Sequence, residues 1–98
     1  MISSKQRAYL RSLANSIDTI IMVGKGGINE QVIKQTSDAL KARELVKGKV
    51  LESCELSSRE VADYIAQQVK ADVVQVIGSK FVLYKRNDKE PKITLPRK

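Results

Sequence analysis

The residues of this sequence with the clearest chemical potential form the loop Gly24–Gly27, which reads Gly-Lys-Gly-Gly. The apolar run 19–23 before it predicts a buried strand, and Asn29 and Glu30 after it are typical of a helix N-cap and first turn. Glycines let the backbone lie flat against a ligand, so that free N–H groups and the positive helix end face that ligand. Lys25 adds a mobile cation. This combination favours the binding of phosphate.

Spacing separates the known phosphate-binding loops. The dinucleotide fingerprint needs G-x-G-x-x-G, and the P-loop needs a glycine five residues before Gly-Lys-Ser/Thr. No glycine precedes Gly24, and Lys25 is followed by Gly26, so neither pattern fits. The remaining G-x-x-G pattern is the loop with which KH modules hold a nucleic-acid backbone. A tight strand-to-helix turn would need the same glycines, and this alternative stays open at this point.

Composition bounds the other functions. The chain has 98 residues, of which 42% are hydrophobic, enough for one small domain with a single core. It has no histidine and one cysteine, so we predict no catalytic residues, no metal site and no cofactor. Cys54 is interpreted as a small buried residue. No signal-peptide pattern or membrane-spanning run is found, and we expect a cytoplasmic protein.

Periodicity and turn signals predict the order αβαβαββ. Crossover helices favour parallel neighbouring strands, Gly78-Ser79 suits a two-residue hairpin, and Ser57 with Glu60 forms a capping box. We therefore expect an α/β (α+β) fold with a mixed four-stranded sheet, in a domain over 1–86 followed by a flexible basic tail over 87–98. The expected helices cover 3–16, 29–42 and 57–70, and the expected strands cover 19–23, 45–51, 73–77 and 81–86.

Two features of the predicted elements bear on binding. Gly48 interrupts the second strand, which favours a bulge or an edge position there. Tyr9 and Tyr64 lie on apolar helical stripes, so base stacking would have only Phe81 or Tyr84 available.

Positive charge gathers in two parts of the chain, whose total formal charge is +7. Residues 1–49 hold nine Lys or Arg against four acids, and residues 80–98 hold seven against two, whereas residues 50–79 hold two against five. One face should therefore bind a polyanion, unless these lysines only increase solubility.

Over about residues 2 to 86 the sequence also resembles a known family. The blocks that carry the resemblance follow one another as in the CRM domain, named for chloroplast RNA splicing and ribosome maturation: Ser4–Arg11, Val23–Asn29, Ala42–Lys47, Val74–Gly78 and Val82–Lys85. The chain looks like the stand-alone bacterial form, the YhbY type. Two residues depart from the family pattern: Asn15, where many members have histidine, and Gly48, where a β-branched residue is usual.

The resemblance implies a fold similar to the C-terminal domain of bacterial translation initiation factor 3, RNA binding, and association with precursors of the large ribosomal subunit. It assigns RNA contact to the loop and to a basic track; Arg43 with Glu44 could equally cap the second helix. The residues implied are Gly24, Lys25, Gly26, Gly27, Lys5, Arg7, Arg11, Arg43 and Lys47.

The sequence thus predicts a monomeric RNA-binding assembly factor without enzymatic activity, whose partner is ribosomal RNA in pre-50S particles. We expect no membrane and no small-molecule substrate. Two alternatives remain open: a nucleotide-binding enzyme that uses the glycine loop, and a protein-interaction module with an acidic partner.

Overall fold

The computed structural model describes residues 2–97, and within them the elements follow the predicted order αβαβαββ. The predicted fold class is confirmed. The helices are α1 (Ser4–Ala14), α2 (Glu30–Arg43) and α3 (Ser58–Val69), and the strands are β1 (Thr19–Val23), β2 (Leu45–Val50), β3 (Asp72–Ile77) and β4 (Lys80–Tyr84).

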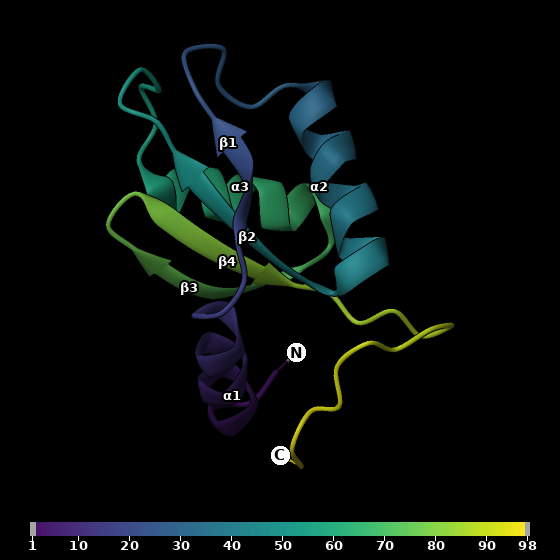
Figure 1. Ribbon diagram of the computed structural model, residues 1–98. Helices are drawn as coiled ribbons and strands as arrows, with labels where there is room; N and C mark the ends of the chain where they lie inside the picture. The colour runs from purple at the N-terminus through teal and green to yellow at the C-terminus, as the bar shows by residue number, and fades with distance from the viewer. Residues whose placement is uncertain (1, 98) are drawn as a thin grey trace.

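The four strands form one mixed sheet in the order β1-β2-β4-β3. β1 and β2 run parallel, and β4 pairs antiparallel with both β2 and β3. Strands β1, β2 and β3 therefore end, and β4 begins, at the same end of the sheet. The loops after β1 and β2 extend from this end, which we call the loop end, whereas α1 lies at the opposite end (Figure 1).

Local hydrogen bonds explain where the elements begin. Asn29 caps α2, because its Oδ1 accepts from the backbone N of Val32 at 2.9 Å. Ser57 and Glu60 form the predicted capping box of α3, with backbone-to-side-chain distances of 3.1 and 3.3 Å. The hairpin between β3 and β4 turns at Gly78, whose φ of +57° suits glycine. These three predictions are confirmed.

The sheet has a separate apolar core on each face. Successive residues of β4 point to opposite faces, so Phe81 and Leu83 pack with α2 and α3, whereas Val82 and Tyr84 pack with Leu10 of α1. We call these the α2/α3 face and the α1 face. Each face thus has its own set of elements to position binding residues.

The prediction of an edge or bulged position for Gly48 is wrong. β2 is an inner strand, and Gly48 is buried beneath the ring of Phe81. A Cβ at this position would lie 2.2 Å from Cζ of Phe81. The register irregularity occurs instead on the neighbouring strand β1, between Thr19 and Ile21. Close packing of an aromatic ring, rather than a break in the strand, requires glycine here.

The segment after β4 has no helix or strand, yet the structure ties its described part to the domain. Nε2 of Gln6 donates to the backbone oxygen of Pro96 at 2.9 Å, and Ile93 and Leu95 pack against the core of the α1 face. These contacts argue against a free tail in the described residues. The division at residue 86 stays a prediction.

Candidate nucleic-acid interface

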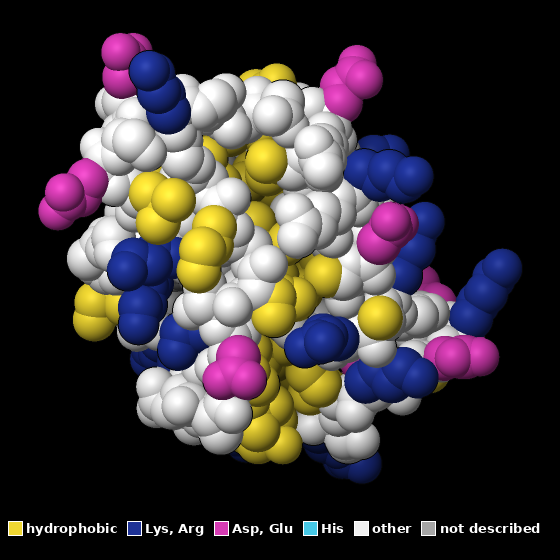
Figure 2. Space-filling model, turned by 45° about the horizontal axis from the view of Figure 1, so that its top comes forward, with side chains coloured by type: hydrophobic (Ala, Val, Ile, Leu, Met, Phe, Trp, Pro, Cys, Tyr) yellow, Lys and Arg dark blue, Asp and Glu magenta, His cyan; other side chains and the backbone are white. Residues whose placement is uncertain are grey.

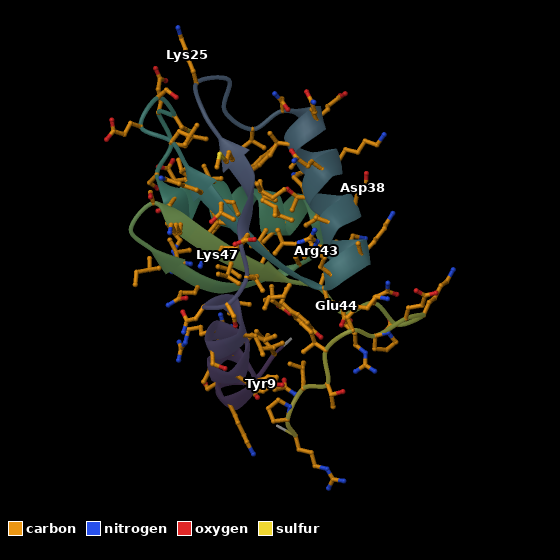
Figure 3. The ribbon with its side chains drawn as sticks, viewed as in Figure 1. Tyr9, Lys25, Asp38, Arg43, Glu44 and Lys47 are labelled. Carbon is orange, nitrogen blue, oxygen red and sulfur yellow. The ribbon has the colours of Figure 1, made fainter. Side chains whose placement is uncertain are left out.

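The glycine loop forms an exposed turn at the end of β1. The backbone N of Gly27 donates to the oxygen of Gly24 at 2.9 Å, and Gly27 has a φ of +65°, which favours glycine. Within residues 2–97, the backbone amides of Lys25 and Gly26 have no hydrogen-bond acceptor. The side chain of Lys25 points away from the domain (Figure 3). The turn therefore presents two free N–H donors and one cation to solvent.

The start of α2 is separated from these donors. Asn29 caps the helix, and Glu30 places a carboxylate in its first turn. An acid at this position offsets part of the positive end of the helix dipole. Glu30 thus weakens the attraction of the helix end for an anion, and the amides of Lys25 and Gly26 are the donors of the turn itself.

The predicted basic residues lie at different places along the domain. Lys25 lies at the loop end, whereas Lys5 and Arg11 are exposed on α1 at the opposite end. Arg43 and Lys47 lie between them and line one groove of about 560 Å³ (Figure 3). With the loop end tilted toward the viewer, hydrophobic, Lys and Arg side chains share the surface with several Asp and Glu side chains (Figure 2).

Two of the residues predicted to contact RNA also stabilise the fold. Nη1 of Arg7 donates to the backbone oxygen of Val73, which ties α1 to β3. Nζ of Lys47 donates to the backbone oxygen of Ala14 at 3.2 Å, where the last carbonyls of α1 favour a cation. Both residues are only partly exposed. Each uses one donor internally and keeps others for a ligand.

Glu44 settles one alternative that the sequence left open. It forms the C-cap of α2 with a φ of +65°, and its backbone N donates to the oxygen of Leu40 at 2.8 Å. Its buried carboxylate accepts from the backbone N–H groups of Asn87, Lys92 and Ile93 at 2.6 to 2.7 Å. Glu44 is structural, whereas Arg43 is exposed and remains a candidate for RNA contact.

Replacing Glu44 by glutamine should lower the free energy of unfolding by about 2 kcal/mol, because an amide offers one acceptor oxygen to three N–H donors and turns its own donors toward them. Urea denaturation would measure the loss. Glu52→Gln is the matched control, since this acid is exposed and should change stability little. An equal loss in both variants would contradict the role of the buried carboxylate.

The prediction of which aromatic rings are available for base stacking is wrong. Phe81 and Tyr84 are 0% and 3% exposed, whereas Tyr9 and Tyr64 are 39% and 49% exposed. Burial, with a contribution from the carboxylate of Glu44, raises the pKa of Tyr84 above 10.0. Because neighbours on a helix point about 100° apart, Leu10 reaches the core while Tyr9 does not. Tyr9 and Tyr64 are thus the rings available for stacking.

Cys54 and two further lysines of the sheet also have defined places in the structure. Cys54 is partly exposed and packs against the core of the α2/α3 face. Lys49 and Lys80, which pair across β2 and β4, are not among the residues that the sequence predicted for RNA contact. The signal for Lys49 was its alternation with Lys47 around Gly48, because alternate residues of a strand share a face.

Comparison with known proteins agrees with the resemblance. The model of the CRS1 / YhbY (CRM) domain family matches residues 2–85. The chain belongs to the CRM family. This membership confirms the expected family and the expectation that the protein is not an enzyme.

Two relatives match along all or nearly all of their length. YqeI of Bacillus subtilis, named a probable RNA-binding protein, is 43% identical over 96 residues, which are 98% of this chain and 100% of the relative. A protein of Haemophilus influenzae named RNA-binding protein is 37% identical, over 99% of this chain and 97% of its own. The likeness therefore extends beyond the domain itself into the C-terminal segment.

The fold has a solved counterpart. The solution structure of a hypothetical protein from Staphylococcus aureus, described as a candidate RNA binder, is 45% identical and superposes with a TM-score of 0.81. The match covers 98% of this chain and 100% of that one. Among residues 2–97, none of the helices is long and apolar enough to cross a membrane.

Proposed function

We propose that this protein binds RNA, with the glycine loop and the basic residues near it as the contact surface. The observation that carries the proposal is the exposed turn Gly24–Gly27, which offers two free amides and Lys25 in a chain of formal charge +7. Phosphate is the ligand that this combination favours. Relatives named as RNA-binding proteins support the assignment.

The RNA that we propose is ribosomal RNA in precursors of the large subunit, bound in the cytoplasm by a monomer that uses no cofactor. Tyr9 and Tyr64 are the rings exposed to solvent, and Tyr64 belongs to the acidic part of the chain. Recognition therefore depends mainly on the backbone and shape of folded RNA, with limited base stacking. Crosslinking in cells followed by sequencing of the attached RNA would identify the partner and its contact site.

Direct binding assays separate this proposal from its alternatives. The affinities for fragments of ribosomal RNA, for free ATP and for an acidic protein should be compared at one salt concentration. We expect tight binding to RNA alone, with a logarithmic affinity that falls linearly with the logarithm of salt concentration. Preference for ATP would instead indicate a nucleotide-binding protein, and preference for the acidic protein would indicate an interaction module.

Replacing Gly26 by aspartate should weaken RNA binding about tenfold or more, because a carboxylate would stand where a phosphate approaches. A Cβ at this position meets no atom within 4 Å, so the fold should be retained. Gly26→Asn, which adds a side chain of the same shape without charge, is the matched control and should lose less affinity. Lys25→Ala should lower the salt slope by about one contact. Unchanged affinity in a folded Gly26→Asp variant would rule out the loop as the binding site.

A further inference from the structure

A row of four residues crosses the whole sheet at the loop end. Met22 of β1 pairs with Lys49 of β2, Lys49 pairs with Lys80 of β4, and Lys80 pairs with Ile77 of β3. We call these four residues the cross-strand row. Their neighbours Gly48 and Phe81 face the α2/α3 side, so the row lies on the α1 face.

Helix α1 leaves this row uncovered. It packs at the other end of the same face, where Leu10 and Ala14 share a core with Leu45, Val82 and Tyr84. The two ends of the cross-strand row are correspondingly exposed, Met22 at 57% and Ile77 at 63%. The row is therefore an open surface with apolar ends and two cations between them.

The two positive charges of the cross-strand row favour the binding of an anion. Like charges directly opposite each other in antiparallel strands destabilise the pair, and Lys49 and Lys80 stand directly opposite. Neither lysine makes a salt bridge within residues 2–97. The adjacent row on this face, Thr19, Lys47, Val82 and Gln75, adds a third lysine and no acid. A phosphate between Lys49 and Lys80 would remove their repulsion.

The backbone beneath the row is fixed. The N of Val50 donates to the oxygen of Ser79 at 2.7 Å, and the N of Leu51 donates to the oxygen of Val23 at 2.8 Å. Oγ of Ser58, at the start of α3, donates to the oxygen of Gly78 at 2.6 Å. These bonds join all four strand ends to one another or to α3, so the two lysines project from a rigid platform.

The geometry points to a specific path for RNA, and this inference rests on the proposed function. We propose that one strand of RNA leaves the glycine loop, passes a phosphate between Lys49 and Lys80, and continues past Lys47 toward α1, while Met22 and Ile77 contact riboses or bases. Met22 lies two residues before the loop, so the path is continuous. It also joins Lys25 to Lys5 and Arg11, which the fold holds at opposite ends.

The test is a double substitution, Lys49→Gln with Lys80→Gln, in the full-length protein. The probe is a fragment of large-subunit ribosomal RNA that the unmodified protein binds. We expect the affinity to fall about tenfold or more, and the salt slope to fall by about two, because two phosphate contacts are lost. Thermal stability should hold or rise, since a like-charge pair disappears.

The matched control is Lys34→Gln with Lys41→Gln, which removes the same charge from exposed positions on α2. Equal losses in the two variants, or no loss in the sheet variant, would overturn the path. Should the double variant fail to fold, Lys80→Gln alone changes one exposed residue and should lower the slope by about one.

Two more variants complete the design. Ile77→Ser should weaken binding without changing the salt slope, because it removes apolar contact and no charge; an unchanged affinity would overturn the part assigned to Ile77. Gly26→Asp distinguishes a wrong path over the sheet from a wrong binding site at the glycine loop. Loss in Gly26→Asp with none in the sheet variant would reject the path and keep the proposed function, whereas no loss in Gly26→Asp would reject the loop as a binding site.

Discussion

Gly48→Ala is expected to lower the free energy of unfolding by about 3 kcal/mol, because overpacking a buried site forces the surrounding side chains from their positions. The added Cβ would lie 2.2, 2.6 and 2.7 Å from three atoms of the Phe81 ring, all closer than packed atoms approach. Phe81 is fully buried and cannot move into solvent. Gly48→Val, with a larger branched side chain, should prevent folding. Thermal and urea denaturation would measure both variants.

Two controls isolate the contact with Phe81. Gly26→Ala adds a Cβ that meets no atom within 4 Å, so it reports the general effect of replacing glycine and should change stability by less than about 1 kcal/mol. Adding Phe81→Leu to Gly48→Ala makes room for the Cβ. The double variant should lose less stability than the sum of the two single losses. Additive losses would show that the ring does not set the requirement for glycine.

Reversing two charges on α1, Lys5→Glu with Arg11→Glu, should weaken RNA binding on the order of a hundredfold, because two attractive contacts become repulsive. Both residues are exposed. Arg7 is left unchanged, since its guanidinium holds the backbone of Val73 and its loss would also destabilise the fold. Filter binding to ribosomal RNA fragments across a salt series would measure the loss.

The control is Lys34→Glu with Lys41→Glu on α2, which changes the net charge by the same amount. Arg11 lies in the last turn of α1 and Lys41 in the last turn of α2, so each pair places one acid at the unfavourable end of a helix. Both variants should therefore have similar melting temperatures. Equal losses of affinity would reduce the interaction to nonspecific attraction by net charge and reject a basic track on α1.

The sequence alone could not predict the path that we propose over the sheet, because strand pairing is nonlocal. The chain places Lys80 after the third helix and β3, far from Lys49, and only the insertion of β4 between β2 and β3 makes the two lysines neighbours. The pattern of β2 alone contained half of this information, namely that Lys47 and Lys49 share a face. Which face lies open depends on where α1 docks.

The assignment of the aromatic residues failed for a related reason. An apolar stripe defines a range of directions on a helix, and Tyr9 and Tyr64 lie within that range. The part of each helix that packs against the sheet is narrower than its apolar stripe. Helix α1 buries Leu10 and Ala14, and α3 buries Val61 and Ile65. Phe81 and Tyr84 point to opposite faces of an inner strand that has a core on both faces, so both are covered.

Short-range chemistry let the sequence by itself determine the order of elements, the caps at Asn29 and Ser57, the hairpin at Gly78 and the exposed glycine turn. Each depends on hydrogen bonds or backbone angles within about four residues, which the local sequence specifies. Only the tertiary structure decided the roles of Gly48 and Glu44 and the pairing of Lys49 with Lys80. Gly48 needs glycine because of a ring 33 positions away, and Glu44 accepts N–H groups from residues 43 to 49 positions later. Such requirements arise only when distant segments pack together.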